Sequence, residues 1–412
     1  MSQNLKPGTR LALDPIGLLY AGTSCKEFPN NYTISVYLNE KINPEILQLA
    51  VTDIFKRLPI LNGKLVETET DFYYEILKET PLISRDNGLY PYEQYYLDGS
   101  RHALRVVYGE AHFKVEAMHF ITDGRSTMEV AKGIAIRYYE LLGVNVEKGY
   151  GIDATDEITS EEFENAFENF STLTEKQTTE ANKEQEFIKA YRHEGSKPET
   201  PHVTTLHFDL GPLKAAAKSY NATINTYIQA QLMAAIAMER DARKCDGRIH
   251  FNFAADCRPY FGSRTFRNFA TGGEFYLNET LPLDGIIATL KNQAKLLNKD
   301  FFQATINQMQ KMLKQSAGLP IAKQKEIVHL AHKSNTSGTT AIFSNIGLVK
   351  FPPSISDKIK NMEFSISQDG NPYTFSVITV GSVMTMTITS SIVGNTLENE
   401  IKHRLENPTF NL

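Results

Sequence analysis

Cysteine is scarce in this sequence. The three thiols, Cys25, Cys245 and Cys257, stand singly along 412 residues, without the Cys-x-x-Cys spacing of a metal or redox motif. This pattern argues against a disulfide framework and against a structural zinc or iron–sulfur site, so we expect no bound metal. It is typical of a protein that works in a reducing cytoplasm. We interpret Cys257 as a buried small residue, because only one arginine beside it would activate a thiol.

An excess of positive charge and long apolar runs are also missing. Lys and Arg total 43 against 48 Asp and Glu, which gives a formal charge of -5 and a pI near 6.1. Such a chain has no overall field that would hold a nucleic-acid backbone. The first 19 residues carry charges and prolines where a signal peptide needs an apolar core, and no window offers about 18 consecutive apolar residues. We therefore expect neither nucleic acid nor a membrane as a partner.

Apolar material is ample, and the chain is too long for one ordinary core. Hydrophobic residues make up 41% of the sequence, with 23 Phe and 19 Tyr. Single cores stop growing near roughly 250 to 300 residues, which predicts two lobes. We place the N-terminal lobe at 1–175, an inter-lobe connection at 176–200 and the C-terminal lobe at 201–412.

Strand and helix patterns alternate in both lobes. Period-two runs predict strands, and apolar residues at spacings of three and four predict helices. In the first lobe the predicted strands are 33–38, 65–77 and 103–121, and the helices are 43–58 and 126–142. In the second lobe the strands are 203–210, 248–256, 273–277, 340–346, 364–366 and 373–390 with a turn at Gly381-Ser382, and the helices are 224–243, 283–316 and 396–406. The fold class is therefore α/β (α+β).

One segment carries candidate chemistry. Strand alternation places His119 on the same face as the apolar residues Val115 and Ala117, which is costly for an imidazole without a partner. Asp123 and Gly124 follow at a strand-to-helix turn, where a free amide can face a ligand. Two readings stay open on this spacing alone: a functional histidine, or a satisfied core histidine before an ordinary Asp-Gly turn.

Three ordered motifs carry a resemblance to a known superfamily. The segment 118–124 resembles the HHxxxDG signature of the chloramphenicol acetyltransferase-like acyltransferases, which include condensation domains, alcohol acetyltransferases and polyketide-associated acyltransferases. Asp256-Cys257-Arg258-Pro259 with Asn268-Phe269 resembles their DxRP…GNF segment, and Ser344-Asn345-Ile346-Gly347 resembles their SNxG strand. The likeness spans roughly residues 11–391.

The resemblance implies a fold and a reaction. The fold is two lobes, each a mixed β-sheet with helices, that form a pseudo-dimer with a tunnel between them. The reaction is direct transfer of an acyl group from a thioester to a small-molecule alcohol or amine acceptor. It needs no bound cofactor, because acyl-CoA or an acyl-phosphopantetheine carrier is the co-substrate. An acyl or peptidyl carrier protein is thus a further partner, and a chain holding both lobes is expected to be a monomer.

The resemblance also implies roles for individual residues. His119 would be the general base, since a neutral imidazole can take the proton of the acceptor. Asp123 would pair with Arg258, in a bidentate contact that supports the turn carrying the histidine. Gly124, Ser344 and Asn345 are candidates for oxyanion stabilisation or substrate binding. For Asn345 an equal alternative is a side chain that bonds its own backbone.

Two positions depart from the family pattern. Met118 stands where the signature has its first histidine, and Arg267 stands where the second motif has glycine. These departures motivate an alternative function, a non-catalytic or condensation-type relative that binds carrier-protein-bound acyl substrates.

Overall fold

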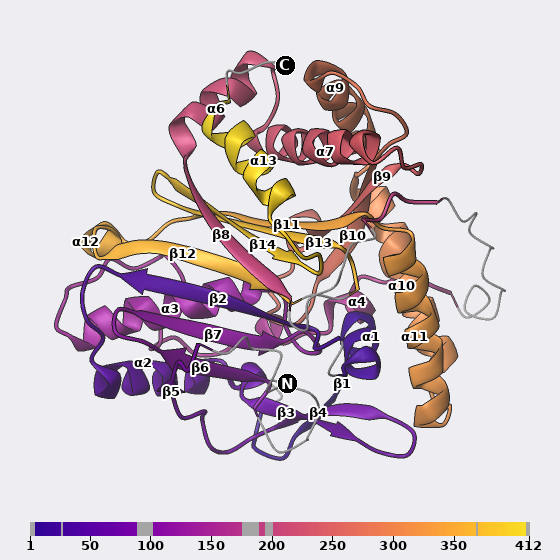
Figure 1. Cartoon of the computed structure of the whole chain (residues 1–412). Coiled ribbons are helices and arrows are strands. Elements are labelled where there is room, and N and C mark those ends of the chain that lie inside the picture. Colours follow the sequence, from indigo (N-terminus) through magenta and orange to yellow (C-terminus); the bar gives the residue numbers. More distant parts are fainter. Residues whose placement is uncertain are drawn as a thin grey trace.

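The structure is a computed structural model that describes residues 5–25, 28–88, 102–174, 189–193, 201–367 and 370–408. Within these ranges it is a mixed α/β protein with three sheets (Figure 1). Of the expected connection at 176–200, only residues 189–193 fall in this part of the chain.

The first half of the chain builds most of a five-stranded sheet with the order β12-β2-β7-β6-β5. All neighbours pair antiparallel except β5 and β6, which are parallel. Helices α2 and α3 pack together, and α3 lies on β2 and β7. The elements are β2 (Asn31–Leu38), α2 (Pro44–Arg57), η1 (Pro59–Leu61), β5 (Ser84–Arg85), β6 (Leu104–Tyr108), β7 (His112–Met118), α3 (Gly124–Leu141) and β12 (Ile359–Ile366).

A smaller sheet, β1-β4-β3, lies beside it, made of β1 (Arg10–Ala12), β3 (Gly63–Glu67) and β4 (Phe72–Ile76). Two predicted long strands are hairpins in the structure. The predicted strand 65–77 is β3 and β4, joined by a turn in which Thr68 N donates to Asp71 O over 2.9 Å. The predicted strand 103–121 is β6 and β7, which reverse at Gly109. A period of two continues through a short turn, so the pattern alone did not mark either reversal.

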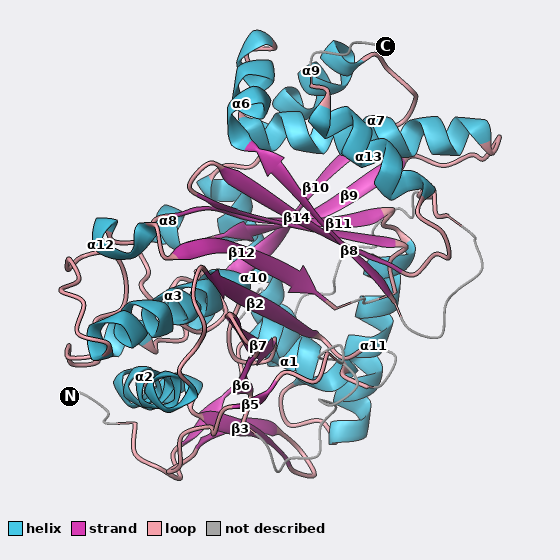
Figure 2. Ribbon diagram, turned by 60° about the vertical axis from the view of Figure 1, so that its left-hand side comes forward, coloured by secondary structure: helices cyan, strands magenta, loops and turns pink. Residues whose placement is uncertain are grey.

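The second half forms a six-stranded sheet with the order β10-β9-β11-β13-β14-β8. Helices α6, α7, α9 and α13 cover one side of it (Figure 2). Helix α7 is buried over most of its length, as its sequence predicted. The elements are β8 (His202–Asp209), α6 (Leu210–Ser219), α7 (Ile224–Ala242), β9 (Ile249–Asp256), α8 (Arg258–Phe261), β10 (Ala270–Leu277), α9 (Leu283–Ala294), β11 (Ala341–Val349), α12 (Pro353–Ser356), β13 (Tyr373–Val380), β14 (Val383–Ser390) and α13 (Thr396–Glu406).

Several helices beside the sheets were not predicted with these bounds. The predicted helix 283–316 is two helices, α9 and α10 (Lys299–Ser316), because Asn298 starts a new helix by accepting a hydrogen bond from Phe301 N. Helices α1 (Pro15–Thr23) and α11 (Ile321–Ser337) were not predicted at all. The short elements η3 (Ser160–Glu162) and α4 (Ala166–Asn169) complete the described fold.

Helix α1 packs on α10 and α11, and two of its glycines allow close approaches, Gly22 to α11 and Gly17 to the chain after β7. A Cβ on Gly22 would lie 2.4 Å from Cγ2 of Val328 on α11, and a Cβ on Gly17 would lie 2.4 Å from Phe120 O. Both approaches are closer than any side chain tolerates, so glycine brings this helix against its neighbours. The packing holds Asp14 and Tyr20 beside the end of β7.

Strand β12 ties the two halves together. It lies in the residues assigned to the C-terminal lobe, yet it pairs with β2 and contributes Met362 and Phe364 to the core of the first sheet. It also lies against β13 and β14 of the larger sheet. The described helices include none that is both long and apolar enough to cross a bilayer.

Candidate functional site

His119 lies between two aromatic rings directly after β7. The Tyr20 ring stacks on the imidazole with centroids 4.2 Å apart, and the Tyr32 ring meets it edge-on at 5.1 Å. The main-chain N–H of His119 donates to Asn30 O over 3.0 Å. One side of the imidazole faces a cavity that both halves of the chain line. The side chain is therefore held by packing while part of it can reach a ligand.

The second half of the chain supplies the polar partner of this histidine. Asn268, just before β10, places its Oδ1 3.2 Å from His119 Nδ1, and its Nδ2 donates to His119 O over 3.1 Å. Burial lowers the pKa of His119 below its usual value, and the Asp123 charge opposes that shift only in part. The imidazole is therefore neutral near pH 7, the form that can accept a proton.

Asp123 caps α3 and does not reach the imidazole. Its Oδ1 accepts from Ser126 N at 3.1 Å, and its Oδ2 accepts from Phe269 N at 2.9 Å and from Arg258 Nη2 at 2.8 Å. Burial raises the pKa of this carboxyl, but the Arg258 charge and the hydrogen bonds outweigh burial and hold the pKa below the usual value. Asp123 is thus an ionised group that joins the two halves of the chain.

Arg258 is the centre of this junction, although its contact with Asp123 is not the bidentate pair expected. Only Nη2 reaches Asp123, while Nη1 donates to Asp256 Oδ1 over 2.9 Å. Nε donates to Thr265 O, and Nη2 also lies within hydrogen-bond distance of Ser126 Oγ and Arg267 O. The fork divides because Asp256 and three oxygens compete for its five N–H groups.

The three candidates for oxyanion or substrate contacts lie away from the cavity lined by His119. Gly124 starts α3, and a Cβ there would lie 3.1 Å from the Phe364 ring and 3.7 Å from Ile346. Ser344 is buried in β11 opposite Ser376. Asn345 accepts from Gly347 N at 2.8 Å and donates to Asn225, so its side chain bonds its own strand. The SNxG strand thus meets the start of α3 through Ile346.

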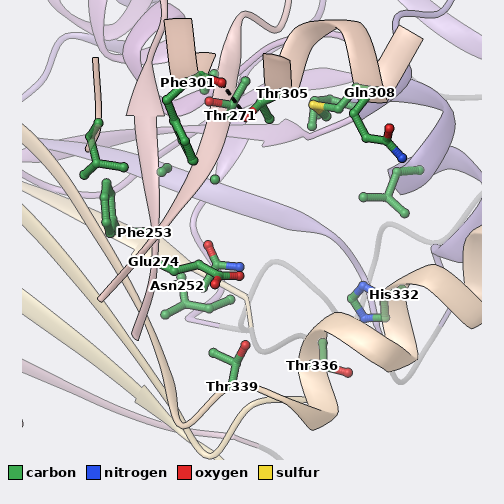
Figure 3. A pocket seen from close by; sticks show the side chains of 18 of the residues that line it. Asn252, Phe253, Thr271, Glu274, Phe301, Thr305, Gln308, His332, Thr336 and Thr339 are labelled. Carbon is green, nitrogen blue, oxygen red and sulfur yellow. Dashed lines mark hydrogen bonds between the residues drawn. The ribbon is translucent and has the colours of Figure 1, made fainter. Parts of the chain in front are cut away.

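The cavity has a volume of about 890 Å³ and a mostly uncharged wall (Figure 3). Strand β10 presents Ala270, Gly272, Glu274 and Tyr276 to it, and α10 presents Phe301, Thr305 and Gln308. Among the described residues that line it, Glu274 is the one acidic side chain and there is neither Lys nor Arg. This wall suits an uncharged chain or ring with some hydrogen-bonding groups.

The sequence did not mark all of this site. Asn268 belonged to a recognised motif, but nothing local indicated that it would contact His119. Tyr20 and Asp14 come from α1, whose only signal was Asp14-Pro15, a typical helix start. Cys257 is buried, and burial raises the pKa of its thiol to about 11, so it is not a nucleophile near neutral pH. Among the residues described, no cluster of three His, Cys, Asp or Glu side chains is placed to hold a metal ion.

Comparison with known proteins gives one family match and several structural ones. Residues 166–405 match the family model described as alcohol acetyltransferase. No curated protein matches the sequence.

Two solved structures share the fold over nearly the whole of both chains. One is polyketide synthase associated protein 5 from Mycobacterium tuberculosis, with a TM-score of 0.65, 13% identity, and 97% of this chain and 98% of the other covered. Another is trichothecene 15-O-acetyltransferase from Fusarium sporotrichioides, with a TM-score of 0.66, 11% identity, and coverage of 98% and 99%. A starter condensation domain of rhizomide synthetase, solved with C8-CoA and Leu-SNAC, has a TM-score of 0.59, 10% identity, and coverage of 97% and 93%.

Proposed function

Since this chain belongs to the alcohol acetyltransferase family of acyltransferases, we propose that it transfers an acyl group from a thioester directly to an alcohol or amine, with His119 as general base. The observation that carries the proposal is the imidazole itself. It is held between Tyr20 and Tyr32, faces a cavity large enough for a substrate, and has a pKa that burial lowers.

In the proposed reaction the acyl group moves from the sulfur of the thioester to the acceptor atom, and the acceptor proton moves to the thiol by way of His119. Nε2 of His119 takes the proton of the acceptor hydroxyl or amine as that atom attacks the thioester carbonyl. The tetrahedral intermediate then collapses, the carbon–sulfur bond breaks, and the imidazolium returns its proton to the thiolate. The products are an ester or amide and a free thiol.

Asp123 and Arg258 support this step without taking part in it. Their contact fixes the turn between β7 and α3 against the second half of the chain. None of the three candidates Gly124, Ser344 and Asn345 lines the cavity that His119 faces, so we assign none of them to the oxyanion. The side chain of Asn345 is also already bonded to Asn225 and Gly347.

The donor is proposed to be acyl-CoA, with an acyl-phosphopantetheine carrier protein as the alternative. A structural relative was solved with C8-CoA, which supports a CoA thioester. Because the described wall of the cavity holds no Lys or Arg, we expect an uncharged part of a substrate there, and the phosphates of CoA outside it.

The test is thiol release from a panel of acyl-CoAs with mixed alcohol and amine acceptors. We expect acceptor-dependent release that falls at least about a hundredfold in His119→Ala, the usual weight of a general base. His112→Ala is the matched control. His112 lies on β7, the strand that His119 directly follows, but it bonds Asp86 at 2.9 Å and does not line the cavity, so its variant should keep nearly the full rate.

Three other results of the thiol-release assay would change the assignment. Full-rate acyl transfer in His119→Ala would exclude the mechanism. A folded protein that releases thiol from no acyl-CoA, but does so from an acyl-carrier protein, would establish the condensation-type donor. Binding of either thioester without any release would favour the non-catalytic alternative.

A further inference from the structure

We propose that Asp14 is a positioning residue for His119: through the Asn268 amide it keeps the imidazole proton on Nδ1 and leaves the lone pair of Nε2 for the substrate. This inference rests on the proposed role of His119 as base. It is based on three buried side chains that contact one another in series, Asp14, Asn268 and His119. No sequence motif connects these three residues.

The hydrogen bonds of Asn268 determine which way its amide points. Its Nδ2 lies 3.1 Å from His119 O and 3.4 Å from Asp14 Oδ1, and both of these atoms are acceptors. The NH₂ group must therefore face them, which turns Oδ1 toward His119 Nδ1 at 3.2 Å. A carbonyl oxygen only accepts, so in this contact Nδ1 carries the proton and Nε2 is the basic nitrogen of the neutral ring. The main-chain groups of His119 and Thr122 also form hydrogen bonds with the ring.

The surroundings of Asp14 exceed what a helix cap requires. Its Oδ1 caps α1 by accepting from Gly17 N at 2.8 Å, a task that an exposed Ser or Asn performs equally well. Yet the residue is 1% exposed, and its Oδ2 accepts no hydrogen bond within the described residues. Burying a charge is costly, and the contact that this placement adds is the one to Asn268.

A buried cation balances the carboxylate. Arg267, which stands where the resembled DxRP…GNF motif has glycine, is 5% exposed, and its Nη2 lies 3.8 Å from Asp14 Oδ2. Burial raises the pKa of Asp14 to about 6 against the opposing Arg267 charge, and nearby Asp123 adds to the rise. The other charged or titratable groups facing this chain of contacts are Glu168 beside Arg267, Arg258 beside Asp123, and the two tyrosines against His119.

The test reads the tautomer directly and needs no substrate. In protein labelled with ¹⁵N-histidine, the His119 signals, assigned with His119→Ala, should show a neutral ring protonated on Nδ1. Asn268→Ala removes the middle member of the hydrogen-bonded series Asp14–Asn268–His119, and Asp14→Ala removes the member farthest from the imidazole. In both variants the signals should move toward the Nε2-protonated form.

A matched control separates positioning from capping. Asp209 caps α6 by accepting from Gly211 N at 2.9 Å and does not line the cavity, so Asp209→Ala should leave the His119 signals unchanged. If Asp14→Ala leaves Arg267 uncompensated and does not fold, Asp14→Ala/Arg267→Met removes both buried charges and is measured instead. An unchanged Nδ1-protonated ring in the folded Asp14 variant would overturn the proposal and leave Asp14 as a cap and counter-ion.

Kinetics give a second readout where acyl transfer is found. Loss of the tautomer preference should lower kcat about fivefold, the weight of one ordinary hydrogen bond, with KM unchanged. A rise in KM at constant kcat would count against positioning. If the protein transfers no acyl group, the NMR result still decides the role of Asp14, so the two proposals fail separately.

Discussion

Individual side chains determine the protonation of the candidate base. His119 is packed between two tyrosines and bonded to an amide rather than to a carboxylate, so burial dominates its ionisation. Asp123 lies four residues further along the sequence, and its carboxylate accepts hydrogen bonds from Arg258 and from two backbone amides rather than from the imidazole. The two residues of HxxxD therefore have separate contacts: His119 faces the cavity and is the proposed base, whereas Asp123 bonds Arg258 and holds the turn.

A pH profile follows from the lowered pKa of His119. With the neutral ring as the proposed base, kcat/KM should rise with pH with a midpoint below pH 6.5, the usual pKa of imidazole. The measurement is thiol release at substrate concentrations well below KM, from about pH 5 to pH 8. A midpoint clearly above 6.5 would contradict the burial of the ring as the dominant cause.

The buried ion pair between Asp123 and Arg258 should contribute to the stability of the fold. Asp123→Asn keeps the cap on Ser126 N but removes the charge facing Arg258, so the free energy of unfolding should fall by about 3 kcal/mol. Urea unfolding followed by circular dichroism measures it. Glu110→Gln, in the exposed pair with Lys41, should produce no measurable change, and an equal loss in both variants would contradict a special role for the buried pair.

Strand β10 forms part of the cavity wall and so influences which substrate shapes fit. Strand β10 alternates with a period of two: Phe275 and Leu277 enter the core of the second half, while Gly272, Glu274 and Tyr276 face the cavity. A glycine in this strand leaves space where any other residue would project a side chain. The width of the cavity near the middle of β10 therefore depends on Gly272.

Filling this space should change substrate preference. A Cβ on Gly272 would lie 3.1 Å from Asn252 Oδ1, a side-chain atom that can shift. We expect Gly272→Val to lower kcat/KM at least about tenfold for the bulkiest substrate accepted and less for small ones. Thr205→Val on β8, outside the cavity lining, is the control. Equal losses for large and small substrates would contradict this assignment of the cavity.

The first sheet contains one strand, β12, that comes from the second half of the chain, so the fold of the first half depends on the second. Because β12 completes the first sheet, residues 1–200 alone would leave the edge of β2 and its apolar neighbours uncovered. One chain also supplies His119, Asn268 and Arg258 to the same site, so we propose that the enzyme works as a monomer.

Fragments test this dependence. We expect residues 1–200 to show no fixed tertiary structure alone, judged by near-ultraviolet circular dichroism of the tyrosines, and to gain it when co-expressed with residues 201–412. A fragment 1–200 with native-like signals and a monomeric elution volume would show that the first half folds independently.

The sequence by itself determined the mixed α/β composition, the helix 396–406 with the bounds observed, the buried character of α7 and the position of His119 at the end of a strand. Those features follow from periodicity and from turn chemistry, which depend on neighbours within a few residues. Only the tertiary structure decided that β12 crosses to the first sheet, that Gly124, Ser344 and Asn345 lie away from the cavity, and that Asp14 and Asn268 meet beside His119. The contacts there join residues 149 and 254 positions apart, and no local pattern carries such a pairing, because it arises from the packing of α1 and β10 around the same imidazole.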